Sequence, residues 1–260
     1  MIETILERMT LREKIEQLNQ IMYLVDDFDK LKERIKKECI GSVILATGCL
    51  AGCTEQETMF VDKLNELQET SMKYHNIPLM FGRDVIHGHN VVWPIPLAMS
   101  ATFNPDMIKK SYEYITEEAN ADGVNWFFSP MIDLARDPRW GRIVEGPGED
   151  PYLGAKMAEA AVKGIQGEGE YIKTAACAKH FVGYGASEGG RDYHRAEISD
   201  YSLRNYYLKS FDMAVKSGVA TVMNSFNEIS GEPTTSSKYL LGDVLRGEMG
   251  FEGFVISDWG

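Results

Sequence analysis

Residues 253–259 read Gly-Phe-Val-Ile-Ser-Asp-Trp, and this stretch indicates the fold most directly. Its apolar residues include the β-branched Val255 and Ile256, and Ser257 and Asp258 follow them at once. Short apolar runs of this kind are typical of strands that are buried on both faces of a parallel sheet. The stretch therefore predicts a buried strand with the carboxylate of Asp258 at its carboxyl end.

Runs of the same type recur along the chain. Together they predict strands at Ile40–Thr47, Pro78–Asp84, Asn125–Asp133, Thr174–Phe181, Val219–Phe226 and Gly253–Trp259. Segments with helical spacing lie between them and predict helices at Thr54–Tyr74, Pro105–Ala121, Pro151–Gln166, Tyr201–Ser217 and Ser236–Glu248. Strands and helices that alternate at this spacing favour a parallel sheet with right-handed crossovers.

Polar residues follow most of these strands, in the groups Arg83-Asp84, Lys179-His180, Asn224-Ser225-Phe226-Asn227 and Ser257-Asp258-Trp259. An open sheet concentrates its site at one switch point, whereas a barrel distributes site residues over the carboxyl ends of many strands. We therefore expect an α/β fold of the TIM-type (β/α)8 barrel class. A closed barrel of this class needs eight strands, and we recognise fewer, so we expect a barrel truncated after the strand that carries Asp258.

The composition and charge exclude some classes of binding partner. The formal net charge of -12 argues against binding to nucleic acid or to an anionic membrane, because both need a clustered basic surface. No stretch approaches the roughly 20 apolar residues that a membrane span requires. Met1–Lys14 predicts an amphipathic helix rather than a signal peptide, so we expect a cytoplasmic protein that takes a neutral substrate.

The sequence predicts neither a metal nor a cofactor. Four cysteines are too few for a disulfide scaffold in 260 residues, and we expect them to be thiols. Cys49 and Cys53 flank a turn without a second cysteine or histidine pair, so we assign no zinc site to them. His87 and His89 also suggest a metal at first sight, but no carboxylate and histidine set completes a site around them.

The polar residues at the predicted strand ends combine carboxylates, cations and aromatic rings. This set is typical of sugar chemistry, because hydroxyl-rich rings need charged partners at their edges and an aromatic face against them. Each residue also has a structural explanation: Asp84 or Asp258 as a helix N-cap, Arg142 as an ion-pair partner of Glu145, Glu149 or Asp150, and Trp140 as core packing. Their coincidence at one rim favours the functional interpretation.

Five stretches with these residues resemble, in order, the N-terminal domain of the family 3 glycoside hydrolases. They are Gly82–Gly88; Asp137–Arg142 continued to Pro151; Ala178–Phe181; Glu188–Tyr193; and Leu245–Glu248 continued to Trp259. The resemblance spans nearly the whole chain. It implies a retaining β-glycosidase, above all a β-glucosidase that releases terminal non-reducing glucose from small β-glycosides or β-linked oligosaccharides.

The resemblance also implies a role for each matching residue. Asp258 corresponds to the nucleophile that forms a glycosyl-enzyme intermediate, and cations around it should lower its pKa. The residues that correspond to the sugar-binding groups of the family are Asp84, Arg142, Lys179, His180, Arg191 and Trp259. No metal or cofactor takes part, and a homo-oligomer is compatible with this interpretation.

Two departures from the family pattern stand out. Residues 222–226 contain no tyrosine where many members have one. The family's acid/base carboxylate comes from a second, α/β sandwich domain, so we expect residues 1–260 to form an incomplete barrel domain without that second domain. Glu145, Glu188 and Asp192 are weaker choices for the acid, because each is better placed to orient a cation.

Four alternatives remain. A β-xylosidase of the same family fits the same motifs. A β-N-acetylhexosaminidase fits less well, because residues 179–185 read Lys-His-Phe-Val-Gly-Tyr-Gly and lack the expected histidine loop. A non-catalytic sugar-binding fragment would keep the nucleophile without an acid. An aldolase or isomerase with Lys179 as a Schiff base is the least supported.

Overall fold

The computed structural model describes residues 2–23, 27–45, 61–169 and 172–259. The chain divides into two compact units, of which the first comprises Met1–Arg83 with Ala119–Trp126. The second comprises Asp84–Glu118 with Phe127–Gly260. All the candidate site residues from the sequence belong to the second unit.

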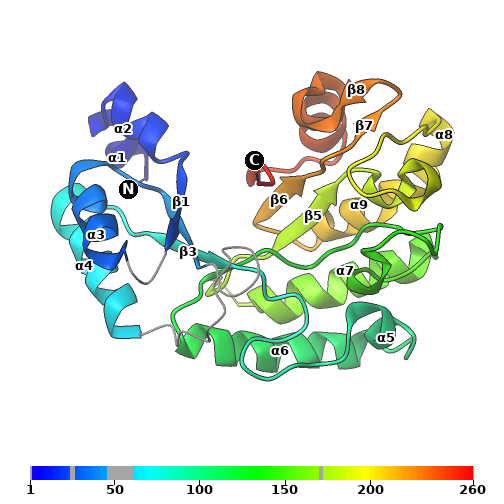
Figure 1. The fold of residues 1–260 in the computed structure, drawn as a ribbon, viewed down its shortest axis with the longest axis horizontal. Coiled ribbons are helices and arrows are strands. Elements are labelled where there is room, and N and C mark those ends of the chain that lie inside the picture. The colour runs from blue at the N-terminus through cyan, green and yellow to red at the C-terminus, as the bar shows by residue number, and fades with distance from the viewer. Residues whose placement is uncertain (1, 24–26, 46–60, 170–171, 260) are drawn as a thin grey trace. The chain divides into compact units, whose positions relative to one another are not determined.

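The first unit is built on a parallel sheet with the strand order β1 (Gln20–Tyr23), β2 (Ser42–Leu45), β3 (Met80–Arg83) and β4 (Trp126–Phe127). Its helices are α1 (Ile2–Arg8), α2 (Leu11–Glu16), α3 (Phe28–Lys37) and α4 (Val61–His75) (Figure 1). The sheet and α3 and α4 bury apolar side chains such as Ile35, Val43 and Leu67. Burial of these side chains is the main source of the unit's stability.

The start of the chain forms two helices instead of the one predicted over Met1–Lys14. Thr10 separates them, because its hydroxyl accepts a hydrogen bond from the backbone N–H of Glu13 at 3.2 Å. The Glu13 carboxylate in turn accepts the backbone N–H of Thr10 at 2.7 Å, which completes a capping box. Thr10 therefore begins α2.

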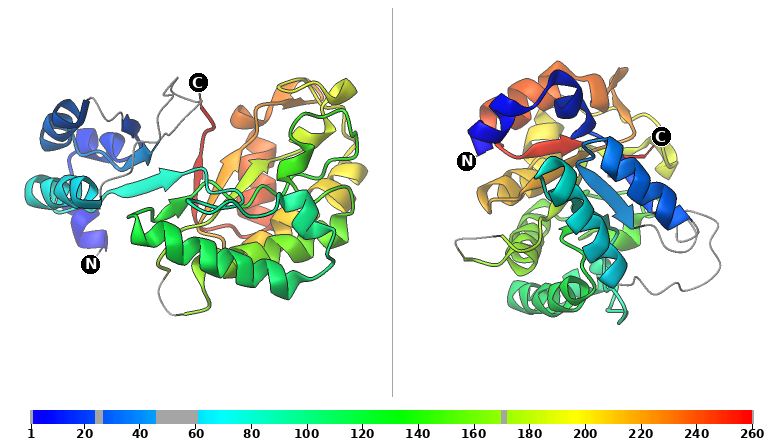
Figure 2. Two further views of the ribbon diagram at one scale, coloured as in Figure 1. Left: turned by 60° about the horizontal axis from the view of Figure 1, so that its bottom comes forward. Right: turned by 90° about the vertical axis from the view of Figure 1, so that its left-hand side faces the viewer.

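The second unit contains a parallel sheet of β5 (Cys177–Phe181), β6 (Thr221–Asn224) and β9 (Phe254–Ile256). The segment 127–132 runs along β5, because Cys177 N–H donates to Ser129 O at 2.8 Å and Ile132 N–H donates to Lys179 O at 2.8 Å. A short antiparallel hairpin of β7 (Glu228–Ile229) and β8 (Glu232–Pro233) follows β6. Figure 2 shows β5, β6 and β9 from two further directions.

Helices and helical turns cover this sheet. They are α5 (Pro96–Ser100), α6 (Pro105–Ala121), η3 (Ile143–Glu145), α7 (Pro151–Gln166), η4 (Tyr184–Ala186), η5 (Glu188–Gly190), α8 (Asp200–Ser202), η6 (Leu203–Tyr207), α9 (Lys209–Lys216), η7 (Thr234–Ser236) and η8 (Tyr239–Glu248). The helix α7 lies beside α9 (Figure 1). It buries a stripe of small residues such as Ala158 and Ala161. Small side chains let neighbouring backbones approach closely.

The strands predicted from the sequence are all present, and each is shorter than predicted. The prediction that the strand before Asp258 is buried is wrong, because Phe254 of β9 is 44% exposed and Val255 and Ile256 are only partly buried. The structure adds β1, which the sequence analysis missed because Gln20–Tyr23 is too short to show a clear pattern. The predicted bounds of α6 and α7 are confirmed. Asp150 begins α7 by accepting the backbone N–H of Leu153 at 2.7 Å.

Three other predicted helices differ in detail. The predicted helix Tyr201–Ser217 is divided into α8, η6 and α9, of which η6 is a π-helical turn. The predicted helix Ser236–Glu248 begins at Tyr239 and has π-helical hydrogen bonding. The first part of the predicted helix Thr54–Tyr74, residues 54–60, lies outside the described residues.

The parallel strands occur in each sheet in the order of the chain, with helices between them. This α/β architecture is the one that a TIM-type barrel uses. The ladders of the described residues form separate sheets, so the closure of the barrel stays a prediction. Within the described ranges, no helix combines the length and the apolar content needed to cross a bilayer.

Candidate active site

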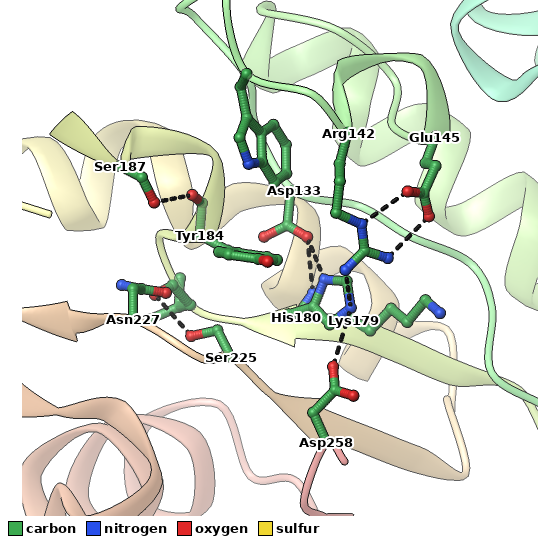
Figure 3. Close-up of polar contacts among 12 residues, drawn as sticks. Asp133, Arg142, Glu145, Lys179, His180, Tyr184, Ser187, Ser225, Asn227 and Asp258 are labelled. Atoms are coloured by element: carbon green, nitrogen blue, oxygen red, sulfur yellow. Dashed lines mark hydrogen bonds and ion pairs between the residues drawn. The ribbon is translucent and has the colours of Figure 1, made fainter. Parts of the chain in front are cut away.

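The candidate site lies at the carboxyl ends of β5 and β9. Lys179 and His180 belong to β5, whose five residues are all buried. Adjacent residues of a regular strand point to opposite faces, but the register of β5 with β6 shifts between Lys179 and Phe181. Figure 3 shows the side chains of Lys179 and His180 in the same cluster, with Asp258 from the segment after β9.

His180 is fixed by one buried carboxylate. Asp133 Oδ2 lies 2.8 Å from His180 Nδ1 and also accepts the backbone N–H of His180 at 2.9 Å. Both side chains are 1% exposed. Burial, with Lys179 and Arg142 adding positive charge, holds the pKa of His180 well below its ordinary value. His180 is therefore a neutral imidazole.

Asp258 faces the other nitrogen of the same ring. Its Oδ2 lies 3.4 Å from His180 Nε2, and its Oδ1 accepts the backbone N–H of Trp259 at 2.7 Å. The Asp258 side chain is 19% exposed, so it is open to a ligand while largely withdrawn from water.

The expectation of a lowered pKa for Asp258 is wrong. Burial raises the pKa of Asp258 above its ordinary value, although the backbone N–H of Trp259 and the charges of Lys179 and Arg142 act in the opposite direction. The cations are present as expected. Desolvation outweighs them because the carboxylate accepts few hydrogen bonds in this position.

Arg142 approaches the ring of His180 from the side of η3. Its guanidinium donates to both oxygens of Glu145 at 2.7 and 2.8 Å, and its Nη1 lies 3.4 Å from His180 Nε2. Burial disfavours the charged forms of both partners, but their mutual attraction raises the pKa of Arg142 and lowers that of Glu145. Glu145 therefore orients Arg142, as expected, and is ionised.

Lys179 is paired with Asp84 across the site. Its Nζ donates to Asp84 Oδ1 at 2.8 Å, and the Lys179 side chain is only 4% exposed. A buried ammonium needs such a partner, because an isolated charge is costly to desolvate. The pairing engages the amine of Lys179 with a carboxylate and gives no support to a Schiff-base lysine.

Aromatic rings pack against the imidazole of His180. Tyr184 packs edge to face on His180 with ring centroids 5.1 Å apart, and Trp140 packs edge to face on Tyr184 at the same distance. The Tyr184 hydroxyl lies between Asp192 and Arg142 without a well-formed hydrogen bond to either. Trp140 is 1% exposed, so its structural explanation as core packing is correct.

Two predicted site residues stand apart from these contacts. Arg191 is exposed, and its Nε donates to the backbone oxygen of Glu188 at 3.3 Å. Trp259 is 64% exposed. Trp259 meets the His180 cluster only through its backbone N–H, which donates to Asp258. The side-chain contacts found for Arg191 and Trp259 within the described residues do not join these side chains to the cluster, and their roles stay predictions.

The possible acids are each engaged by another group. Besides Glu145, Glu188 pairs with Arg195 at 3.1 Å, and Asp192 accepts the indole N–H of Trp140 at 3.2 Å. The contacts of Glu145 and Glu188 agree with the expectation that these carboxylates orient a cation, whereas the contact of Asp192 is with the indole of Trp140.

No group of three or more histidine, cysteine, aspartate or glutamate residues forms a metal site within the part of the chain that the structure describes. His87 is a loop histidine whose Nδ1 lies 2.8 Å from the backbone oxygen of Trp93. Cys39 and Cys177 are buried thiols. Cys49 and Cys53 lie outside the described residues.

Sequence reasoning missed Asp133 and Tyr184. Asp133 ends a predicted strand, as Asp84 does, and a carboxylate in that place could have marked it as a site residue. Unlike Asp84, which follows Arg83, it has no charged residue directly beside it in the chain. Tyr184 follows the Lys-His-Phe stretch at a spacing that gives no hint of ring packing on His180. Both side chains meet His180 through tertiary contacts alone.

The fold and the site define a parallel α/β protein with carboxylates and cations at the carboxyl ends of its strands. Residues 10–260 match the profile described as the glycosyl hydrolase family 3 N terminal domain. The chain belongs to glycosyl hydrolase family 3.

Relatives within this family are similar over most or all of the chain. It is 36% identical over 264 residues to the periplasmic beta-glucosidase of Salmonella typhimurium, which covers 100% of this chain and 33% of that protein. It is 39% identical over 198 residues to a beta-xylosidase of Formosa agariphila, which covers 72% of this chain and 27% of that protein.

A solved structure shares the fold. The beta-glucosidase from Listeria innocua in complex with glucose matches with a TM-score of 0.86 at 37% identity, covering 99% of this chain and 37% of that one. The same Listeria protein has been solved as a D270A mutant with laminaribiose. The chain thus spans about a third of the length of the curated relatives that it matches first.

Proposed function

We propose that this protein is a retaining β-glycosidase in which Asp258 is the nucleophile. The observation that carries the proposal is the position of Asp258, partly exposed at the end of β9 and 3.4 Å from the neutral His180. Lys179, Arg142 and Asp84 supply donors and acceptors for sugar hydroxyls around this carboxylate. Family membership supports the same reaction class.

The proposed reaction has two steps. An oxygen of Asp258 attacks the anomeric carbon, the bond from that carbon to the leaving oxygen breaks, and an acid gives this oxygen a proton. Water then loses a proton to the conjugate base, attacks the anomeric carbon and releases the carboxylate of Asp258. The raised pKa of Asp258 sets the acidic limit of activity above that of an ordinary aspartate.

We further propose that the acid lies outside residues 1–260. A retaining mechanism needs two carboxyl groups about 5–5.5 Å apart across the scissile bond. Glu145, Glu188 and Asp192 are each bound to another side chain, and the ionised Glu145 is a poor proton donor. The relatives' greater length leaves room for such a residue elsewhere.

Glucose is the proposed sugar, and xylose is the second candidate. The relatives from Salmonella and Listeria are named beta-glucosidases, and the Listeria protein binds glucose and laminaribiose. The Formosa relative is a beta-xylosidase, which keeps β-xylosides open. The ratio of kcat/KM for 4-nitrophenyl β-glucoside and β-xyloside distinguishes the two.

A cytoplasmic location and a homo-oligomer are further proposals. The Salmonella relative is named a periplasmic protein, so it does not support the cytoplasmic location.

The nucleophile is tested by trapping its intermediate. The complete gene product is treated with 2-deoxy-2-fluoro-β-glucosyl fluoride, whose fluoride leaves without an acid while a bond forms between the anomeric carbon and Asp258. We expect the added sugar mass on the peptide that contains residues 253–259. Asp258→Asn is the control and should remain unlabelled.

Labelling at another carboxylate contradicts the assignment of Asp258. Binding of glucose without labelling and without turnover of an aryl glucoside supports a sugar-binding protein instead. In either case the family assignment, which rests on the whole sequence, is unaffected.

A further inference from the structure

Asp133 is a buried carboxylate whose two oxygens are used unequally. Oδ2 accepts two hydrogen bonds from His180, one from the backbone N–H at 2.9 Å and one at Nδ1 at 2.8 Å. Oδ1 has no hydrogen-bond partner among the described residues. A buried oxygen without a partner costs free energy, so the contacts of Oδ2 must offset this cost.

These two contacts determine where the proton of the imidazole lies. The backbone N–H of His180 can only donate, so Asp133 Oδ2 is an acceptor in that bond. At a pH above its pKa of about 7 Asp133 is ionised, and the same oxygen is then best satisfied if Nδ1 also donates to it. A neutral imidazole has one N–H, and burial keeps His180 neutral, so Nε2 is left with a lone pair.

Two groups lie near Nε2: the guanidinium of Arg142 agrees with this assignment, whereas the carboxylate of Asp258 alone would favour a hydrogen on Nε2. Arg142 Nη1 is a donor at 3.4 Å and can only point a hydrogen at an acceptor. With a lone pair on Nε2, the guanidinium and the imidazole are complementary. With a hydrogen on Nε2, two donors would face each other. Asp258 Oδ2 then receives no hydrogen bond from His180, although it is 3.4 Å away.

We propose that Asp133 is a positioning residue that holds His180 as the Nδ1–H tautomer, so that Nε2 presents a lone pair beside Asp258. The inference rests on the proposed function for its catalytic consequence. His180 accepts a hydrogen bond from a hydroxyl of the sugar, while Lys179 and Arg142 donate to the sugar. The carboxylate of Asp258 stays free to attack, because no imidazole N–H is bound to it.

The tautomer is measured at a pH above about 7, where Asp133 is ionised, by nitrogen NMR of the histidine side chains in the complete gene product. His180→Gln is used to assign the signal among the histidines. We expect a protonated Nδ1 and an unprotonated Nε2 for His180. Asp133→Asn should keep this pattern, because its amide oxygen can replace Oδ2. Asp133→Leu removes the acceptor, and we expect the proton to move to Nε2, where Asp258 accepts it.

Two NMR results overturn the proposal: an Nε2–H tautomer in the unsubstituted protein, or an unchanged Nδ1–H tautomer in Asp133→Leu. The first result decides the matter even if Asp133→Leu fails to fold. The measurement needs no turnover. The two proposals can therefore fail separately. If the fluorosugar labels Asp258 but His180 is the Nε2–H tautomer, only this inference is refuted. If His180 is the Nδ1–H tautomer but nothing is labelled, only the proposed function is refuted.

Kinetics test the catalytic consequence. A lost hydrogen bond to a buried group lowers kcat/KM for the aryl glucoside roughly 10- to 100-fold, so we expect a loss of that size for Asp133→Leu and a smaller one for Asp133→Asn. A purely structural role would lower the amount of folded enzyme and leave the kcat/KM of the folded fraction unchanged. Equal kcat/KM values for Asp133→Leu and the unsubstituted enzyme, measured per active site, overturn the proposal.

Discussion

Lys179 shows how a single residue of this site depends on its partner. Its ammonium is nearly inaccessible to water, and Asp84 lies 2.8 Å away and is partly exposed. The lysine cannot lose its partner without leaving a buried charge uncompensated. The pair therefore contributes both to stability and to the position of a donor that we assign to sugar binding.

A double-mutant cycle measures this dependence. We expect Asp84→Asn, Lys179→Met and the double variant to give a coupling free energy of about 1–2 kcal/mol in chemical unfolding. The control is Lys216 and Asp212, an exposed pair on α9 at 2.6 Å, for which we expect less than about 0.5 kcal/mol. Equal coupling in both pairs would show that burial does not strengthen the Lys179 pair.

Asp133 makes stability depend on pH. Burial raises the pKa of Asp133 to about 7, so its proton is bound more tightly in the folded chain than in the unfolded one. The stability that this proton contributes is complete below the unfolded pKa of about 3.9 and is lost as the pH rises through about 7.

The measurement is the free energy of unfolding of the unsubstituted protein and of Asp133→Asn at several pH values. Between pH 4 and 7 the unsubstituted protein should lose stability relative to the variant, by at most about 1.4 kcal/mol per pH unit. Parallel curves for the two proteins would show that Asp133 ionises in the folded state as it does in the unfolded state.

At the scale of elements, the irregular register of β5 decides the composition of the site. A regular strand would send Lys179 and His180 to opposite faces. The register with β6 shifts between Lys179 and Phe181, so the side chains of β5 do not alternate regularly at this point. The adjacent residues Lys179 and His180 can therefore both belong to one site. The sequence predicts the strand and its polar end but not the register shift.

The packing of α6 against α7 offers a test at the same scale. A Cβ at Gly164 of α7 would lie 2.5 Å from the backbone oxygen of Lys109 and 2.7 Å from Cβ of Tyr112, both in α6. Because a backbone atom cannot move away alone, we expect Gly164→Ala to destabilise the protein by about 1–3 kcal/mol.

Gly242→Ala is the matched control for this substitution. Gly242 also lies within a helical segment, η8, and its new Cβ would meet only the flexible Lys238 side chain at an ordinary 3.7 Å. Alanine is favoured over glycine in helices, so we expect stability to be unchanged or raised by up to about 1 kcal/mol. A similar loss in both variants of a thermal unfolding experiment would contradict the packing explanation.

At the scale of the whole molecule, the proposal that the acid lies outside residues 1–260 predicts how activity depends on the leaving group. Residues 1–260 alone should release good leaving groups such as 2,4-dinitrophenolate from β-glucosides far faster than methanol, because only poor leaving groups need a proton. The complete gene product should depend less steeply on the pKa of the leaving group. An equally shallow dependence for residues 1–260 would place an acid within them.

The sequence by itself determined β2 to β6 and β9, the main helices and the family. Short β-branched runs are recognisable because a strand buried on both faces must be apolar along its whole length. Motifs such as Gly253–Trp259 mark Asp258, because its place at a strand end is local in the chain. For the same reason the bounds of α6 and α7 were predictable from cap residues and prolines.

Only the tertiary structure decided how these residues act on one another. It brought Asp133 to His180 and Asp84 to Lys179, which are 47 and 95 residues apart in the chain. It also reversed the expected shift in the pKa of Asp258, because sequence shows the nearby charges but not how much water a fold removes. The spacing of residues along the chain does not show which distant segments touch or which side chains are buried. The tautomer of His180 and the pKa of Asp258 depend on both.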